Sequence, residues 1–441
     1  MSTDLPGRAV YLVDGMRTPF LRAEVPAPGP FAAADLAVRA GQSLFSKLSI
    51  SPEIIQHVVI GCGGASADEM NIARIVGLRL GCDQSTPAFT VQRNCASGLQ
   101  AVDSGAQLIA SGRHDVVLVG GCEAMSHAPL MTHPNIARWL ARLQKAKGNW
   151  KKLKLISSFP FKNLKPESAL LKGLSDPVIG LSMGQTAEVI AKRFKIDRQM
   201  MDAWAAESHL RALAAQKDSL FDEEIAPIYD GKGLSYLADN GVRTDSTPER
   251  LAKLKPVFDR PYGAVTAGNS SQLTDGACLL LLASEKAVKK YQLKPLAKIK
   301  DVAWAGLDPK QMGLGPVYAS HQILKRQKLS TAAVDCWEIN EAFAAQTLAC
   351  LAAFADAEFC KNEFKLKAAY EAIDPEKVNI HGGAIAIGHP VGASGARILL
   401  HLAQVLKAKK VPAQGIASLC IGGGQGGAVL IANCQQEETG E

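Results

Sequence analysis

The sequence lacks any C-x-x-C pair, although ten cysteines are scattered along its 441 residues. Zinc-site spacing is therefore absent, and the scatter is typical of reduced thiols in a reducing compartment. Residues 1–8 contain no apolar signal segment, no apolar run is long enough to span a membrane, and the last residues are not a peroxisomal address. These absences predict a cytoplasmic protein, with a processed organellar form as the alternative.

The sequence also has little excess charge. Its net charge is +7, charged residues make up 21% and apolar residues 47%, so the chain is globular rather than disordered. A modest positive charge suits an anionic small substrate or a surface and does not by itself indicate nucleic acid, so no nucleic-acid partner is predicted. The length allows about three domains of ordinary size.

Short apolar strands alternate with helices in two parts of the chain. The first part has predicted strands at 9–13, 58–60, 88–91 and 116–119 and helices at 71–80 and 99–110. The second part follows a strand-like stretch at 264–283, and has strands at 297–303, 334–339, 416–420 and 428–433 and helices at 341–354 and 395–407. Alternation predicts a parallel α/β sheet covered by helices, and its recurrence predicts a duplicated fold with a pseudo-twofold axis.

Residues 122–260 have a different character, because proline and charged residues become frequent and strand signals fade. Two helices are predicted here, at 184–194 and 198–218, and Asp197 is the expected N-cap of the second. Residues 138–172 hold ten Lys or Arg and a single Glu.

Four apolar side chains at the start of this basic segment recur at helical spacing: Ile136, Trp139, Leu140 and Leu143. They predict a short basic amphipathic helix. Such a helix suits a membrane surface, a partner protein or the phosphates of an anionic ligand. The alternative is a solvated face with a few apolar residues docked on the body.

Cys95 follows the predicted strand 88–91 and a polar turn, and it precedes the predicted helix 99–110. A thiol at a helix N-terminus meets unpaired N–H groups and the helix dipole, which favour the thiolate. This placement suits a nucleophile, although a cysteine is often only a small buried hydrophobic residue.

Four segments combine glycine with polar residues, at 94–95, 340–343, 381–390 and 420–427. Each lies at the carboxyl end of a predicted strand or in a loop, where open α/β sheets place their sites. Glycines allow close backbone approach and supply the N–H groups of an oxyanion hole. His389, between two cysteines in sequence, suits a base to one of them, and the second thiol suits another proton transfer. No P-loop and no dinucleotide-binding glycine motif is present.

These motifs together resemble the thiolase family. The resemblance rests on Asn-Cys-Ala-Ser-Gly at 94–98, Asn-Glu-Ala-Phe at 340–343, the glycine-rich run ending in Gly388-His389-Pro390, Gly-Ala-Ser-Gly-Ala-Arg at 392–397 and Cys-x-Gly-Gly-Gly at 420–424. Segments 17–20, 121–126 and 266–271 add to it, and the order holds from about residue 8 to residue 433.

The resemblance implies a role for each catalytic position. Cys95 would carry the acyl group as a thioester, His389 would activate it, and Cys420 would be the second acid and base. Asn340, through a water shared with His389, would hold the enolate oxygen, while the N–H groups of Cys95 and Gly422 would form the other oxyanion hole.

The resemblance also implies a coenzyme A site and an architecture. The aligned coenzyme A contacts are Met183, Arg243, Phe258, Ser271, Met312 and Phe343, of which Met312 and Phe343 equally suit an ordinary core. Coenzyme A would be a substrate, and no metal or redox cofactor is expected. The expected architecture is a duplicated α/β/α/β/α layered fold with an inserted loop domain, assembled as a homodimer or homotetramer. Its parts would be residues 1–121 completed by 261–285, the loop domain 122–260, and residues 286–441.

Three departures from the family pattern bear on the subfamily. Ser182 and His381 stand where short-chain biosynthetic thiolases carry His and Asn, respectively. The basic insertion at 134–172 resembles the extended loop of thiolase subunits in fatty-acid oxidation complexes, which meets a hydratase/dehydrogenase subunit or a membrane. The run from Cys420 to Gly424, in contrast, resembles stand-alone acetoacetyl-CoA thiolases.

The first hypothesis is therefore a 3-ketoacyl-CoA thiolase of fatty-acid β-oxidation, an acetyl-CoA C-acyltransferase. The second is a biosynthetic acetoacetyl-CoA thiolase that condenses two acetyl-CoA molecules. A carrier-protein ketosynthase is disfavoured, because that class lacks a second cysteine such as Cys420 in a glycine-rich turn. A non-catalytic protein that binds lipids or a partner is the last alternative, and loss of Cys95, His389 or Cys420 would be its mark.

Overall fold

The computed structural model describes residues 5–23 and 29–434, and its centre is a single ten-stranded sheet. The strand order is β12-β13-β14-β11-β1-β10-β5-β3-β4, with β2 paired to β10. The N-terminal half of the sheet contains β1 (Val10–Arg17), β2 (Leu21–Arg22), β3 (His57–Gly61), β4 (Ala88–Val91), β5 (Val116–Ala124) and β10 (Thr274–Ser284). The C-terminal half contains β11 (Ala297–Gly306), β12 (Cys336–Ile339), β13 (Gln414–Ile421) and β14 (Gln425–Asn433).

The two halves repeat one pairing pattern, which confirms the predicted duplication. In the first, β3 is parallel to β5, which is antiparallel to β10, which is antiparallel to β1. In the second, β12, β13, β14 and β11 follow the same sequence of directions. The halves meet where β1 and β11 pair antiparallel. Even β4, parallel to β3, has a counterpart in the parallel bridge between Trp337 and Val378.

The prediction of a parallel sheet is wrong in part, because each half contains antiparallel pairs beside its parallel ones. A tight turn joins β13 to β14, and a connection this short permits only antiparallel pairing. The predicted strand at 264–283 is shorter than expected, since β10 begins at Thr274. Before it, the Asn269 side chain accepts a hydrogen bond from the Thr266 amide at 2.8 Å, and such local bonds favour a loop over a ladder.

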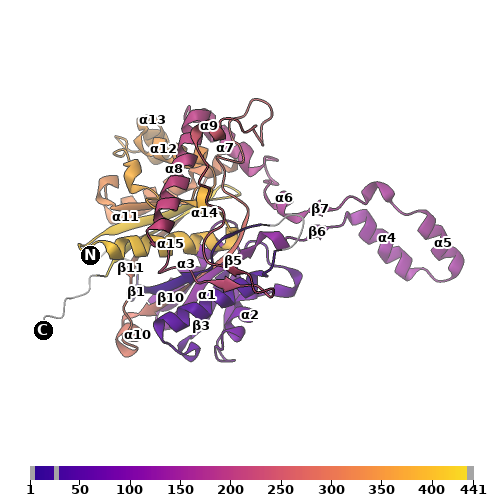
Figure 1. The fold of residues 1–441 in the computed structure, drawn as a ribbon, viewed down its shortest axis with the longest axis horizontal. Helices are drawn as coiled ribbons and strands as arrows, with labels where there is room; N and C mark the ends of the chain where they lie inside the picture. The colour runs from indigo at the N-terminus through magenta and orange to yellow at the C-terminus, as the bar shows by residue number, and fades with distance from the viewer. Residues whose placement is uncertain (1–4, 24–28, 435–441) are drawn as a thin grey trace.

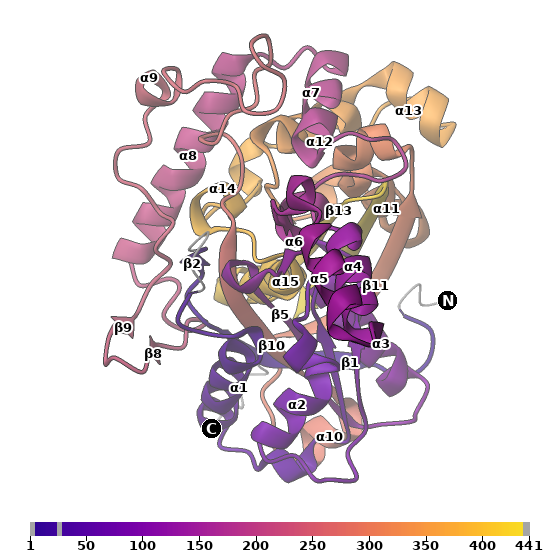
Figure 2. The ribbon, with the colours of Figure 1, turned by 90° about the vertical axis from the view of Figure 1, so that its right-hand side faces the viewer.

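Five layers result, as predicted. Helices α3 (Ser97–Ala110) and α15 (Val391–Ala408) lie between the two halves of the sheet and contact both each other and the strands. Helices α1 (Ala33–Leu48) and α2 (Ile72–Arg79) cover the outer face of the first half, and α11 (Gly315–Gln327) and α12 (Ala344–Ala355) cover that of the second (Figures 1 and 2). Apolar residues of α3, α15 and both half-sheets form one buried core between them.

A long insertion separates β5 from β10. Its main helices, α7 (Met183–Arg193) and α8 (Arg198–Lys217), both pack against α12, and α8 also packs against α14 (Ala384–Ile387). The predicted cap of α8 is confirmed, because the Asp197 side chain accepts from the Met200 amide at 2.9 Å. The shorter elements are α6 (Ala169–Gly173), β8 (Ile228–Tyr229), β9 (Ser235–Tyr236) and α9 (Pro248–Leu251) here, and α10 (Glu285–Lys290) and α13 (Ala357–Phe364) later in the chain.

The basic segment forms a helical hairpin that projects from the body, at the right of Figure 1. It consists of α4 (Pro134–Lys145), which is the predicted amphipathic helix, and α5 (Asn149–Ser157). The two-residue strands β6 (Leu130–Met131) and β7 (Glu167–Ser168) pair at its base. Within the described residues, no helix has the length and apolar character that crossing a membrane would need. Residues 1–4 and 437–441, which also entered the prediction of location, lie outside the described residues.

Candidate active site

Cys95 sits in a tight turn held by its neighbours. Asn94 has a φ of 44°, and the Ser97 hydroxyl accepts from the Arg93 amide at 2.9 Å while donating to the Asn94 carbonyl at 2.7 Å. The Asn94 side-chain amide donates to the Gly422 carbonyl at 2.9 Å. This last bond joins the Cys95 turn to the turn between β13 and β14. Its two residues, Asn94 and Gly422, are 328 positions apart in the chain.

The helix N-terminus predicted that Cys95 favours the thiolate form, and the structure does not agree with this prediction. Burial raises the pKa of Cys95 above its ordinary value, and hydrogen bonds from the amides of Gly422 and of Cys95 itself offset this only in part. The thiol therefore holds its proton at neutral pH and needs a base to become a nucleophile.

Cys420 lies at the end of β13 and is almost completely buried. Burial, with smaller contributions from the neighbouring thiols of Cys95 and Cys350, raises the pKa of Cys420 well above its ordinary value. A neutral thiol beside a second neutral thiol can deliver a proton to one substrate atom while the other attacks a carbon.

His389 immediately precedes Pro390, the N-cap of α15, and is the base that this arrangement requires. Its Nδ1 lies 2.6 Å from the Ser394 hydroxyl, and that hydroxyl donates to the Pro390 carbonyl at 3.0 Å. Because the hydroxyl proton is already used, Nδ1 carries the imidazole proton and donates it to Ser394. Nε2 is then an unprotonated acceptor, and it has no partner among the described residues.

The environment of His389 keeps the ring neutral. Burial, and secondarily the charge of Arg397, lower the pKa of His389 to about 4. A neutral imidazole with a free Nε2 lone pair can accept a thiol proton at physiological pH.

Asn340 follows β12 and presents an amide with no partner. The residue is fully buried, and its backbone N–H donates to the Ser418 carbonyl at 2.9 Å. Its side-chain Nδ2 and Oδ1 are both unpartnered within residues 5–23 and 29–434. A buried amide left unpaired costs free energy, so this position suits a bound water or a substrate oxygen.

Backbone contact between the two central helices brings these loops together. A Cβ on Gly98 would lie 2.7 Å from the Gly392 carbonyl oxygen, and one on Gly395 would lie 2.6 Å from the Leu99 nitrogen. The buried Glu123 carboxylate reinforces the junction, since it accepts from the amide of Gly392 at 2.9 Å. The N-terminal ends of α3 and α15 therefore meet, next to Cys95 and His389.

Four of the six predicted coenzyme A contacts lie beside these loops. The Met183 sulfur is 3.1 Å from the place of a Cβ on Gly422, and the Ser271 amide donates to the Ala342 carbonyl at 3.0 Å. The rings of Phe258 and Phe343 are 5.9 Å apart, edge to face.

The other two positions differ from this group. Met312 is fully inside the core, and the Arg243 guanidinium pairs with Asp245 at 3.1 Å on the surface beyond α8. Ser182 has a structural explanation, because it caps α7 in a reciprocal capping box with Gln185. The serine therefore orients the helix on which Met183 stands.

Sequence reasoning missed Ser394, whose role depends on the tautomer of His389. Its only signal was its place within the 392–397 motif, five residues after the histidine. In the described parts of the chain, no group of three or more His, Cys, Asp or Glu side chains is arranged to hold a metal ion.

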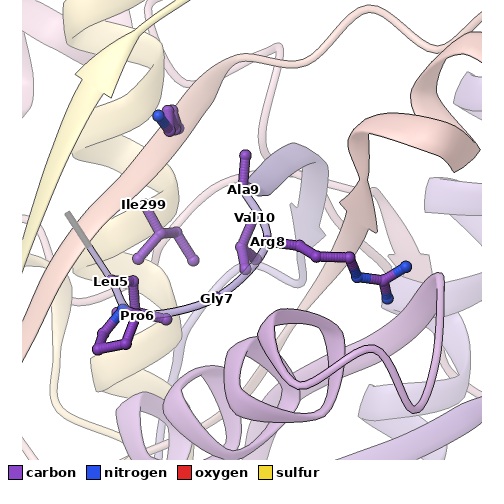
Figure 3. A pocket seen from close by; sticks show the side chains of 8 residues that line it. Leu5, Pro6, Gly7, Arg8, Ala9, Val10 and Ile299 are labelled. Carbon is purple, nitrogen blue, oxygen red and sulfur yellow. The ribbon is translucent and has the colours of Figure 1, made fainter. Parts of the chain in front are cut away.

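A surface hollow of about 280 Å³ lies elsewhere, where the N-terminal segment passes β11. Figure 3 shows Leu5, Arg8 and Ile299 around it. The Arg8 amide donates to the carbonyl of Ala110, the last residue of α3. This helix has 14 residues and begins at the Cys95 turn, so the hollow is roughly 20 Å from the thiol and does not belong to the site.

Comparison with known proteins agrees with this geometry. Residues 10–286 match the family description "Thiolase, N-terminal domain", and residues 293–433 match "Thiolase, C-terminal domain". The chain is 39% identical to the mitochondrial 3-ketoacyl-CoA thiolase of Bos taurus over 430 residues, covering 97% of this chain and 98% of the relative. It is 36% identical to the mitochondrial trifunctional enzyme subunit beta of Homo sapiens over 425 residues, covering 96% and 88%.

A solved structure shares the whole fold. The crystal structure of human mitochondrial 3-ketoacyl-CoA thiolase in complex with CoA matches with a TM-score of 0.83 at 37% identity, covering 97% of this chain and 98% of that one. With two adjoining domain matches, near-complete relatives and a common fold, the chain belongs to the thiolase family.

Proposed function

We propose that this protein is a 3-ketoacyl-CoA thiolase, an acetyl-CoA C-acyltransferase that acts in fatty-acid β-oxidation. It cleaves 3-ketoacyl-CoA with free coenzyme A to acetyl-CoA and an acyl-CoA shortened by two carbons. The observation that carries the proposal is the approach of the Cys95 turn to the Gly422 turn and of the start of α3 to the start of α15. These segments carry or adjoin two protonated thiols, an unpartnered imidazole nitrogen and an unpaired buried amide. Breaking a C–C bond next to a thioester needs each of these groups.

In the first half of the proposed cycle, His389 Nε2 takes the Cys95 proton and the thiolate attacks the 3-keto carbon. The alkoxide forms between the amides of Cys95 and Gly422. The C2–C3 bond then breaks, leaving the acyl group on Cys95 and the electron pair in the enolate of acetyl-CoA. Asn340 and a water shared with His389 hold the enolate oxygen, and the Cys420 thiol protonates its carbon.

In the second half, the Cys420 thiolate takes the proton of an incoming coenzyme A thiol. The coenzyme A sulfur attacks the thioester on Cys95, again through an alkoxide between the two amides. Collapse releases acyl-CoA, and the Cys95 thiolate recovers its proton from the His389 imidazolium. Both thiols and the imidazole return to their starting states, so protons and electrons balance over the cycle.

Substrate binding belongs to the same proposal. Residues 122–260 form a loop domain over the site, between the halves 1–121 with 261–285 and 286–441. Met183, Phe258, Ser271 and Phe343 would line the pantetheine channel, Met312 would support it from the core, and Arg243 would exchange Asp245 for a nucleotide phosphate. Coenzyme A is a substrate, and we propose no resident metal or redox cofactor.

The test is thiolysis of a 3-ketoacyl-CoA series from four to sixteen carbons, with kcat/KM measured for each. We expect kcat/KM to rise toward long chains. Activity confined to acetoacetyl-CoA would instead assign the biosynthetic reading, in which two acetyl-CoA molecules condense. Failure with every chain length, with folding intact, would leave only a non-catalytic lipid- or partner-binding protein.

We further infer that the α4–α5 hairpin is a docking element. Its basic surface carries exposed apolar side chains, including Trp150 at 81% and Leu153 at 61% of their full exposure. The human relative is named a subunit of a trifunctional enzyme. Either a hydratase/dehydrogenase subunit or an anionic membrane surface suits this composition.

The two partners can be distinguished with one pair of proteins. The intact chain and a chain lacking residues 135–165 are each mixed with anionic vesicles, neutral vesicles and a purified hydratase/dehydrogenase subunit. Loss of vesicle binding in the deletion assigns the membrane, and loss of co-elution with the subunit assigns the partner. Equal behaviour of both chains in every mixture would refute the docking role.

Self-association is proposed through β4. This strand is the last of the sheet, so one row of its backbone groups is unpaired by any other strand in the described chain, and Phe89 on it is exposed. Pairing of two β4 strands would give a homodimer and, with a second interface, a homotetramer. Sedimentation should show at least a dimer for the cytoplasmic form of the protein and a shift toward monomer for Phe89→Lys.

A further inference from the structure

The Glu341 carboxylate is buried and accepts four hydrogen bonds from other parts of the chain. Trp204 Nε1 and Asn379 Nδ2 each donate to Oε1 at 3.0 Å. The Ser208 hydroxyl and the Ile385 amide donate to Oε2 at 2.7 and 3.3 Å. Trp204 and Ser208 stand on α8, Asn379 follows the bridge between Val378 and β12, and Ile385 stands on α14. The Glu341 side chain therefore connects three separate segments to the loop that follows β12.

No ion pair accompanies this carboxylate within the described residues. Two other buried acids have cationic partners, since Glu224 contacts Arg17 and His401 and Glu338 contacts Arg397, whereas Glu123 is held by backbone amides. Glu341 is stabilised by neutral dipoles alone. Burial of a carboxylate is expensive, and only a complete set of donors makes it tolerable. A neutral side chain would avoid that expense, so a function for the charge is indicated.

The joined elements are those that present the two groups of the enolate site. Glu341 follows Asn340 directly, and Ile385 lies in the four-residue helix α14, which ends just before Gly388 and His389. The contact is close, because a Cβ on Gly383 would lie 2.4 Å from the Glu341 carboxyl carbon. The carboxylate therefore contributes to the distance between the Asn340 loop and the His389 loop.

Two links connect the loops of Asn340 and His389. Backbone bonds of residues 271–272 make one, from the Ser271 amide to the Ala342 carbonyl and from the His389 amide to the Gln272 carbonyl, and the Glu341 side chain makes the other. Both amide atoms of Asn340 and Nε2 of His389 are unpartnered among the described residues, as the binding of a shared water requires. Their spacing depends on the backbone of the two loops, and these loops meet at Glu341. Ser208 extends the link, since its oxygen also accepts from the Gly383 amide at 3.0 Å.

We propose that Glu341 is a positioning residue, which sets the separation between the Asn340 amide and His389 Nε2 and so builds the hole for the enolate oxygen. The inference rests on the proposed function, because it assumes that these two groups bind the enolate. A carboxylate is needed because its two oxygens can each accept from two donors at once. A glutamine has one such oxygen. In either orientation its NH₂ group would face an N–H that can only donate, which is Trp204 Nε1 at one position and the Ile385 amide at the other.

The test compares two reactions that use different parts of the site. Acylation of Cys95 by acyl-CoA needs the base and the hole formed by the Cys95 and Gly422 amides. Exchange of the acetyl-CoA α-proton with deuterium oxide needs the enolate hole. For Glu341→Gln we expect exchange to fall by about 10²–10³-fold, the loss seen when one oxyanion donor is removed from another enzyme. Acylation should fall less than about tenfold, and KM for coenzyme A should change little.

Two further variants keep the test decisive if Glu341→Gln does not fold. Ser208→Ala removes the shortest donor and should reduce exchange more than acylation, by a smaller factor. Ser320→Ala removes a buried hydroxyl of α11 that has no partner in the described chain and is the matched control, for which both rates should stay within a fewfold of wild type. Equal losses of exchange and acylation, or unaltered exchange, in Glu341→Gln or Ser208→Ala would overturn the positioning role. Wild-type protein that neither acylates nor exchanges would instead refute the proposed function.

Discussion

Replacement of Ser394 by alanine tests how the protein prepares its base. The substitution removes the hydroxyl that accepts the Nδ1 proton of His389 at 2.6 Å. The rest of the helix N-terminus is preserved, because the Pro390 carbonyl still accepts from the amides of Ala393 and Ser394 at 2.9 and 3.0 Å. The effect should therefore be confined to the imidazole.

The magnitude follows from the cost of an unpaired buried donor. With Ser394→Ala, the Nδ1–H of His389 loses its only acceptor in a buried place, at a cost of about 1–3 kcal/mol. The tautomer equilibrium then shifts toward Nε2–H, which leaves no lone pair for Cys95. Since 1.4 kcal/mol is a factor of ten, the ratio of the Nδ1–H tautomer to the Nε2–H tautomer should fall roughly 5- to 150-fold, and acylation should slow by at most that factor.

The assay is a rapid-quench measurement of acyl-enzyme formation at saturating acyl-CoA, with the Cys95 adduct quantified by mass spectrometry. Ser320→Ala is the control, because this buried hydroxyl of α11 has no partner in the described chain and lies away from the site. Its acylation rate should match wild type. Acylation of Ser394→Ala at the wild-type rate would show that the hydrogen bond does not select the tautomer.

Other parts of the site lead to three more expected results. Cys420→Ala should acylate Cys95 within a fewfold of wild type but lose at least about 10²-fold in α-proton exchange, and unchanged exchange would remove Cys420 from the mechanism. The pKa of His389 is about 4 in the folded state against 6.5 unfolded. The unfolded state therefore binds more protons between these values, and the free energy of unfolding should drop by up to about 3 kcal/mol from pH 7 to pH 4; urea titrations of wild type and His389→Asn should differ in this slope. In Gly184→Ala, a Cβ would lie 2.2 Å from the Phe258 ring, so unfolding should require about 1–3 kcal/mol less and KM for coenzyme A should rise; an unchanged melting temperature would contradict this packing.

Local patterns in the sequence were sufficient for most elements. The predicted strand at 88–91 coincides with β4, and the predicted helix at 198–218 exceeds α8 by one residue, because apolar periodicity and an N-cap are properties of neighbouring residues. Strand direction was not predictable in this way. Both faces of β10 are buried, so its residues show no alternation, and its antiparallel place between β1 and β5 depends on partners more than 140 residues away.

In the candidate site, too, local sequence patterns predicted some features and not others. Cys95, His389, Asn340 and Cys420 were found because each stands at the end of a strand in a short motif. The contacts that set the protonation states of these residues were not predicted, because they are made by residues from distant parts of the chain. The raised pKa of Cys95 comes from burial that a helix N-terminus alone does not reveal, and the charge state of a base depends on contacts such as that of Ser394.

The glycine contacts around the starts of α3 and α15 limit which substitutions can accumulate during the evolution of this fold. A Cβ on Gly121 of β5 would lie 1.9 Å from the Gly392 carbonyl oxygen, and one on Gly98 or Gly395 would lie 2.7 or 2.6 Å from a backbone atom of the other helix. The separation of nucleophile and base is thus set by main chain against main chain, where no side-chain substitution can adjust it gradually. Parts of the surrounding insertion are under no such restriction, since a Cβ on Gly173 would meet nothing within 4 Å, so new partners can be acquired there while the reaction itself stays fixed.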